Sequence, residues 1–182
     1  CYDCHMPHTT YGLLKAIRSH EIDSPSVQVS MDTGRPNACN LCHLDRTLAW
    51  TAEHTSRWYG HPAPEPWPAE ETSAALRWLL AGDAGQRALL AWHFAWAPAH
   101  AASGRGWQAP HLELLLEDPY AAVRLVAARS LRRLAALERA VGSEPARVDR
   151  AQVLLRPDGT WDAEAARDLF ATRDDRAVSL AE

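Results

Sequence analysis

The sequence has no long apolar run and no excess of positive charge, and these two absences exclude two broad classes of function. No stretch of the 182 residues approaches the roughly 18 consecutive apolar residues that a helix needs to cross a bilayer. We therefore expect no transmembrane segment. The formal net charge is −4 at pH 7, whereas a nucleic-acid-binding domain normally carries a basic face. We therefore expect no nucleic-acid partner.

Cysteine is also scarce, and all four cysteines fall in two Cys-x-x-Cys pairs, each followed at once by a histidine, in residues 1–5 (CYDCH) and 39–43 (CNLCH). This spacing is the attachment signature of c-type haem. Two thiols add to the porphyrin vinyl groups, and the histidine that follows reaches the iron from the same side. We expect two haems c, held as thioethers by Cys1, Cys4, Cys39 and Cys42, with His5 and His43 as proximal iron ligands.

Three other interpretations of the cysteine pairs remain open. The pairs could form a Cys4 zinc site, redox dithiols or disulfides of an exported protein. None of these requires a histidine after either pair. Histidine accounts for 9 of the 182 residues, so finding one at both positions by chance is roughly a one-in-four-hundred event. The sequence therefore favours haem.

Methionine is too rare to be the expected sixth ligand of the two irons, because the chain contains only two. Met6 directly follows His5 and cannot reach the opposite face of the same haem. Met31 lies between the motifs, in a segment that we expect to be a loop. Histidine is commoner near the motifs, so we predict bis-histidine ligation, as expected for an electron carrier.

Three histidines are candidates for the distal positions. His20 ranks first, because it precedes a proline-bounded turn that could carry its ring over a haem. His54 ranks second and lies about three turns beyond His43, on a predicted helix at 47–59. His8 ranks third and could serve a different haem, including one in a partner. His61 is a weaker candidate, in a Pro-rich loop. We expect ordinary core or surface positions for His93, His100 and His111.

The residues around both motifs resemble the haem segments of bacterial multihaem cytochromes c. The similar stretches are 4–13 (CHMPHTTYGL), 17–25 (IRSHEIDSP) and 36–45 (PNACNLCHLD), with Trp50 and the Trp-Tyr-Gly of 58–60 after them. In such proteins the Cys-His-Met-Pro run is followed by a histidine before a proline, and that histidine is an axial ligand. The matching position is His20. The resemblance covers roughly residues 1–61, a third of the chain.

Beyond these residues the pattern changes from irregular to helical. Residues 62–69 form a Pro-rich linker, since closely spaced prolines prevent a helix. Capping residues and apolar spacing then predict helices at 70–81, 83–96, 110–117 and 118–140, the last with Asp118 as N-cap. Residues 151–155 could be a short strand or turn, and Asp162 caps a further helix that ends near Phe170.

A weak internal repeat runs through the helical part. Residues 86–94 align with 123–131 at an offset of about 37, close to the period of paired-helix HEAT or armadillo repeats. The segment 116–131, with an Asp cap, a Val-Arg pair and small Ala residues, resembles a HEAT repeat. Such repeats would stack into a short solenoid that presents an extended docking face. An ordinary helical bundle is the alternative.

Taken together, the sequence predicts a mainly α protein. Its parts are an irregular, haem-wrapped cytochrome c segment at 1–61, the linker at 62–69 and an α-helical HEAT-like repeat domain at 70–182. The first part is expected to be the C-terminal end of a larger multihaem domain. Haem is attached outside the cytoplasmic membrane, so we also expect an export signal and further haem motifs upstream.

The expected function is electron transfer by an exported bacterial protein, periplasmic or extracellular. Electrons would pass through the bis-histidine haems to a redox partner protein or a neighbouring cytochrome subunit, and a homo-oligomer is compatible with this role. An enzyme is the less favoured interpretation. It would be a subunit of a multihaem oxidoreductase that acts on a small nitrogen or sulfur compound. A third interpretation makes the repeats the functional scaffold and the haems structural.

Overall fold

The computed structural model describes residues 1–12, 14–141 and 148–176, and this part of the chain is mainly helical, as expected. Residues 142–147 and 177–182 of the predicted repeat domain lie outside the described residues. No helix in the described ranges is long and apolar enough to span a membrane. The N-terminal elements are α1 (Tyr2–His5), β1 (Thr10–Gly12), β2 (Lys15–Ile17), α2 (Val27–Thr33), α3 (Ala38–Cys42) and α4 (Leu48–Tyr59). The remaining elements are α5 (Ala74–Leu80), α6 (Ala84–His93), α7 (Ala97–Ser103), α8 (Ala109–Leu114), the 3-10 helix η1 (Leu115–Glu117), α9 (Ala121–Val141) and α10 (Ala163–Ala171).

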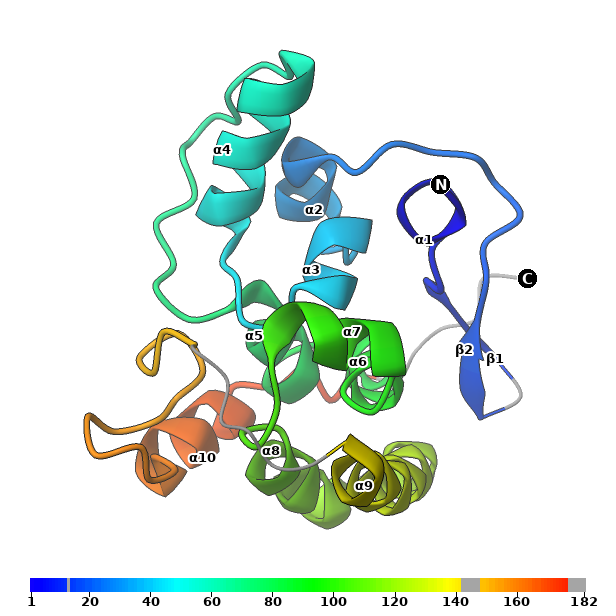
Figure 1. The fold of residues 1–182 in the computed structure, drawn as a ribbon, viewed down its shortest axis with the longest axis vertical. Helices are drawn as coiled ribbons and strands as arrows, with labels where there is room; N and C mark the ends of the chain where they lie inside the picture. The colour runs from blue at the N-terminus through cyan, green and yellow to red at the C-terminus, as the bar shows by residue number, and fades with distance from the viewer. Residues whose placement is uncertain (13, 142–147, 177–182) are drawn as a thin grey trace.

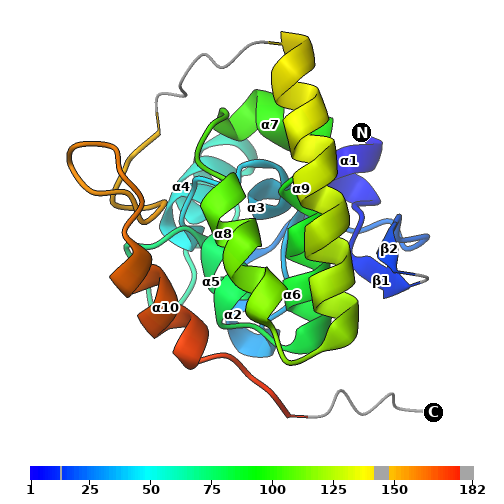
Figure 2. The same cartoon turned by 90° about the horizontal axis from the view of Figure 1, so that it is seen from below.

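The helices lie in tiers (Figure 1). The motif-bearing elements α1 and α3 occupy one side with α2 and α4, helices α5, α6 and α7 lie in the middle, and α8, α9 and α10 lie on the far side. Helix α5 packs on α6, α8 packs on α9, and the most extensive contact between helices joins α6 to α9 (Figure 2). The antiparallel hairpin of β1 and β2, in which Gly12 faces Lys15, packs against α6.

One hydrophobic core runs through all three tiers. Leu41, inside the second Cys-x-x-Cys-His motif, and Leu44, directly after it, are buried in the same cluster as Leu79, Leu90 and Leu134. Burying a leucine side chain contributes about 1.5–3 kcal/mol. The second motif is therefore fixed by the helical part of the chain.

Local capping explains where several helices begin. The side chains of Asn37, Thr47 and Asp83 each accept a hydrogen bond from the backbone three residues ahead, at the starts of α3, α4 and α6. Asp83 forms a complete capping box with Gln86. Asp162 caps α10 as predicted. The predicted helix at 47–59 is confirmed as α4.

Other boundaries differ from the prediction. The helix expected from residue 70 begins at Ala74, because Ser73 supplies the N-cap. The helix expected to reach residue 96 ends at His93, and Pro98 lies in the first turn of a separate helix, α7. There the missing N–H of proline costs no hydrogen bond. Residues 62–69 contain no helix, as expected for the linker.

Two further predictions were wrong in detail. Met31 lies in α2, which Ser26 caps, and not in a loop. Asp118 was expected to begin the long helix, but α9 starts at Ala121 and Asp118 pairs with a buried arginine instead. The segment 151–155 forms turns and ends in a single β-bridge between Leu155 and Trp161.

Candidate haem-attachment site

The two Cys-x-x-Cys-His motifs lie on α1 and α3, and these two short helices contact each other (Figure 1). In α1 the His5 N–H donates to the carbonyl of Cys1 at 2.9 Å. In α3 the His43 N–H donates to the carbonyl of Cys39 at 2.7 Å. Each motif therefore places both sulfurs on one helical turn, with the histidine directly after it. All four cysteines are free: Cys1, Cys4, Cys39 and Cys42.

The His5 ring is held in one orientation and one tautomer. Its Nδ1 lies 2.8 Å from the carbonyl oxygen of Asp23. A carbonyl oxygen only accepts hydrogen bonds, so Nδ1 carries the proton and Nε2 of the neutral ring keeps a free lone pair. Histidine ligands of metals are typically fixed in this way. Arg18 supports the same turn, because its guanidinium donates to the Met6 carbonyl at 2.8 Å and to the Asp3 carboxylate at 2.7 Å.

The His54 ring is held in the same tautomer as the His5 ring. Its Nδ1 lies 2.8 Å from the carbonyl oxygen of Trp50, one turn earlier on α4, which again leaves Nε2 free. The ring is half-buried. Of the three candidate distal ligands, His54 is therefore the one whose hydrogen bonding prepares it for a metal.

An aromatic row connects this histidine to the second motif. The ring of His43 lies 4.8 Å from that of Trp50, Trp50 stacks on His54 at 4.2 Å, and His54 meets Trp58 at 4.9 Å. Burial, followed by the charges of Arg46 and His54, lowers the pKa of His43 and favours the neutral ring. The sequence analysis missed this row, although its spacing of four residues along α4 was a readable signal.

The other two candidates differ in their surroundings. His8 packs against Trp92 at 5.1 Å and Trp96 at 5.4 Å, and its buried Nδ1 has no hydrogen-bond partner in the described part of the chain. Burial, followed by the charge of Arg18, lowers the pKa of His8. His20 is exposed on the segment between β2 and α2, and within the described ranges no side-chain hydrogen bond, ion pair or ring contact joins it to either motif. His61 lies 6.2 Å from the ring of Tyr59.

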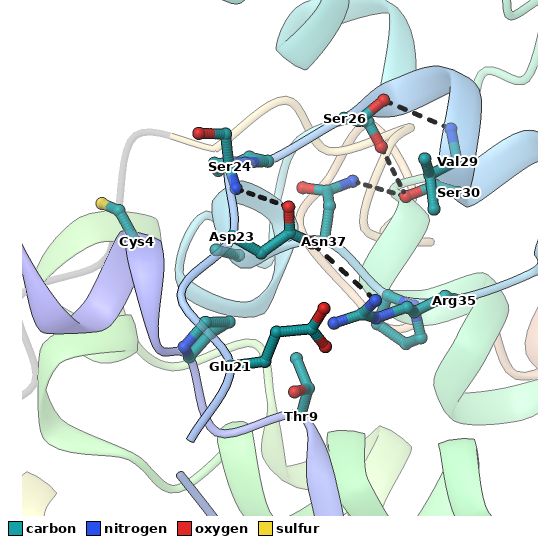
Figure 3. Close-up of a pocket in the computed structure, with 14 residues that line it drawn as sticks. Cys4, Thr9, Glu21, Asp23, Ser24, Ser26, Val29, Ser30, Arg35 and Asn37 are labelled. Carbon is teal, nitrogen blue, oxygen red and sulfur yellow. Dashed lines mark hydrogen bonds and ion pairs between the residues drawn. The ribbon is translucent and has the colours of Figure 1, made fainter. Parts of the chain in front are cut away.

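A cavity lies beside the first motif (Figure 3). It has a cavity volume of about 60 Å³, and Cys4 lies at its edge. Its other walls come from the segment that carries Asp23 and from the start of α3, where Asn37 donates to Ser30 at 3.2 Å. Arg35 forms a 3.8 Å ion pair with Asp23 there. The cavity therefore joins α1, α2 and α3.

The thiols of the second motif are partly buried. Burial, reinforced by the neighbouring cysteines for Cys39 and by Asp3 and Cys4 for Cys42, raises the pKa of both thiols to about 11. Across the described ranges, no three His, Cys, Asp or Glu side chains gather as a ready metal site.

The three remaining histidines are core residues, as expected. His93, His100 and His111 are each at most 4% exposed. Each donates Nε2–H to a backbone carbonyl, belonging to His8, Phe94 and Val153 respectively. Burial lowers the pKa of His93 and of His111 to about 4.

Comparison with known proteins adds no family assignment. A scan against protein-family models finds no match. Searches of curated proteins and of solved structures also find none. The function is therefore argued from the residues and their geometry alone.

Proposed function

We propose that this chain is part of an exported multihaem c-type cytochrome that carries electrons through covalently bound haems. The observation that carries the proposal is the geometry of α1. Two free cysteines lie on one turn, and the next residue, His5, points a free Nε2 away from the Asp23 carbonyl that holds its Nδ1 at 2.8 Å. Thioether attachment needs two thiols at this spacing, and axial ligation needs a histidine nitrogen with a free lone pair.

Each Cys-x-x-Cys-His motif would hold one haem. Cys1 and Cys4 would bind one porphyrin and Cys39 and Cys42 the other, and when bound each haem supplies reversible one-electron exchange at its iron. His5 and His43 would be the proximal ligands. The contact between α1 and α3 would keep the two groups close together. The distal candidates are His54, His20 and His8, of which hydrogen bonding supports His54.

The helical part would serve as a docking surface for a redox partner or a neighbouring subunit. The pairs α5 with α6 and α8 with α9 stack through α6 and α9, and these two helices carry the internal repeat noted in the sequence. This arrangement supports the proposal of a short HEAT-like solenoid. Haem attachment outside the cytoplasmic membrane implies a periplasmic or extracellular site of action.

Intact-mass measurement tests haem attachment directly. The chain, exported with its haem-attachment machinery, should carry two haem increments on the polypeptide mass. The double variants Cys1→Ala/Cys4→Ala and Cys39→Ala/Cys42→Ala should each carry one. If a double-alanine variant kept both haem mass increments, the haem would be attached at residues other than the substituted cysteines. A wild-type mass equal to that of the bare polypeptide would refute the proposal.

Ferric-state spectra test the carrier role. Bis-histidine ligation predicts low-spin haem throughout, and His54→Ala should convert up to one haem of the two to high spin. His61→Ala is the matched control and should leave the spectrum unchanged. A high-spin haem in the wild-type chain would instead favour the oxidoreductase alternative, because an open iron position is where a small substrate would bind.

A further inference from the structure

A groove outside the candidate haem site gathers positive charge. It lies where the β hairpin meets α6 and α9, and it has a cavity volume of about 220 Å³. Figure 2 shows the hairpin beside these two helices. The cations that line it are Lys15 of β2 and Arg129 and Arg133 of α9. None of the side chains that line it is a carboxylate.

The three cations have no acidic partners. Within the described ranges, none of them takes part in an ion pair. The Arg129 guanidinium makes one long hydrogen bond, 3.4 Å, to the carbonyl of Leu14. In a chain with a net charge of −4, three unpaired cations around one small groove are a local excess of positive potential that attracts anions.

Ser130 offers a hydroxyl group to the groove. Ser130 lines the groove, is 5% exposed, and makes no hydrogen bond that the structure shows. The hydroxyl groups of other serines and threonines buried in helices, such as Thr55 and Ser103, donate to the backbone one turn earlier. The Ser130 hydroxyl is not one of the enclosed polar atoms that lack a partner in the described residues, so it is reached from the groove and can donate to a bound acceptor there.

The rest of the groove is apolar. Val126 is almost fully buried, Trp92 presents a half-buried indole, and Leu14 covers the third side. An apolar wall with a few convergent donors is the usual construction of a small-molecule site. The arginine guanidinium is suited to carboxylates, because its planar fork can bind both oxygens at once.

We propose that this groove binds a small organic anion with a flat apolar body and a carboxylate group. The carboxylate would contact Arg129, Arg133 and Lys15 and accept the hydrogen bond of Ser130, while the body would lie against Trp92. This binding activity is separate from electron transfer. Because Trp92 also contacts His8 at 5.1 Å, the bound ligand would share a wall with the first motif segment.

Isothermal titration of the complete, haem-loaded protein with 2-naphthoate at low ionic strength tests the site. The variants Arg129→Gln and Arg133→Gln should each weaken binding by about tenfold, as expected for loss of one charge-assisted hydrogen bond. Arg132→Gln is the matched control, since this neighbouring arginine is exposed and does not line the groove. It should leave the affinity unchanged. Equal losses in all three variants would overturn the proposal by showing a diffuse charge effect.

The ligand itself supplies a second control. The uncharged amide, 2-naphthamide, should bind at least tenfold more weakly than 2-naphthoate, and acetate should bind more weakly still because it has no apolar body. Ser130→Ala should weaken naphthoate binding without changing the haem spectrum. If 2-naphthamide binds as tightly as 2-naphthoate, or if no heat of binding appears for the wild type, the proposed site does not exist.

Discussion

At the scale of single residues, His111 is enclosed by the core. Its ring lies 5.9 Å from that of Trp107 and 6.0 Å from that of Trp161, and its Nε2–H donates to the Val153 carbonyl at 3.1 Å. Burial lowers the pKa of His111 to about 4, and the hydrogen bond offsets this only in part. The neutral ring therefore links α8 to the segment before α10.

This depressed pKa makes stability depend on pH. The unfolded chain takes up a proton near pH 6.5 and the folded chain only near pH 4, so the stabilisation is complete above pH 6.5 and is lost as pH falls towards 4. The free energy of unfolding should fall by on the order of 3 kcal/mol per buried histidine over this window. His111→Gln should remove its share of that slope in denaturant titrations at pH 7 and pH 4.5. An unchanged slope would contradict the prediction.

The proposed attachment residues stand out in the sequence because their signal is local. Five consecutive residues define each motif, and no tertiary information is needed to find His5 or His43. The choice among the candidate distal ligands depends instead on contacts between distant segments. His8 meets Trp92 and Trp96 more than eighty residues away, and the orientation of His54 comes from a carbonyl that the sequence pattern does not display.

At the scale of elements, one buried ion pair joins α6 to the start of α9. Arg87 is 1% exposed, and its guanidinium donates to Asp118 at 2.7 Å and 3.2 Å, to Asp175 at 3.1 Å, and to the carbonyls of Gly82 and Asp174. All three nitrogens of the Arg87 guanidinium therefore donate to an acceptor. A buried guanidinium needs such partners because the charge has left water.

Removing the buried Asp118 carboxylate should lower the free energy of unfolding far more than removing the exposed Asp175 carboxylate. Asp118→Asn should lower the free energy of unfolding by about 3–5 kcal/mol, since it leaves a buried cation without its main partner. Asp175→Asn is the control: its carboxylate is 43% exposed, so the loss should be about 0–1 kcal/mol. Urea titration of both variants measures the difference. Equal losses would show that the pair does not stabilise the fold.

Capping explains which elements could be read from the sequence. The starts of α6 and α10 were predicted because Asp83 and Asp162 act within their own turns. Helix α7 was not predicted because a proline such as Pro98 more often suggests the end of a helix, although it also fits a first turn. Asp118 has a capping side chain, but its carboxylate pairs with Arg87, which lies 31 residues earlier in the chain. The same carboxylate also accepts the backbone N–H of Tyr120 at 2.8 Å, so Asp118 keeps a local bond although the helix begins only at Ala121.

At the scale of the whole molecule, the two ends of the chain differ in how much apolar surface they bury. Where burial is described within residues 1–40 (10, 11 and 13 excepted), the buried apolar side chains other than prolines are Ala16, Val27 and Ala38, whereas α5 alone buries six residues. The N-terminal segment therefore has little of its own to hold it together. The predicted wrapping around porphyrin remains a proposal, and this scarcity supports it.

Loss of haem should unfold the two ends unequally. In the Cys1→Ala/Cys4→Ala/Cys39→Ala/Cys42→Ala variant, amide hydrogens of residues 1–36 should exchange rapidly, while those of α5, α6 and α9 stay protected. Hydrogen exchange read by mass spectrometry, with the haem-loaded protein as reference, checks this. Equal protection at both ends in the haem-free variant would mean that the N-terminal segment folds by itself.

The division into 1–61, 62–69 and 70–182 followed from composition, which shows a Pro-rich boundary but not what crosses it. In the structure, Leu41 and Leu44 cross that boundary into the shared core. Such long-range packing depends on the whole arrangement and has no local sign. The mainly α class was predictable because helical periodicity and caps are properties of short segments.

The burial of Leu41 and Leu44 in the core shared with α5 and α6 also sets an order of folding events. When the second motif is synthesised, α5 and α6 do not yet exist, so these two leucines stay unburied until the chain has been extended past His93. In the proposed cytochrome, attachment outside the cytoplasmic membrane would act on a chain in which α3 has not yet docked, and docking would then bury both leucines.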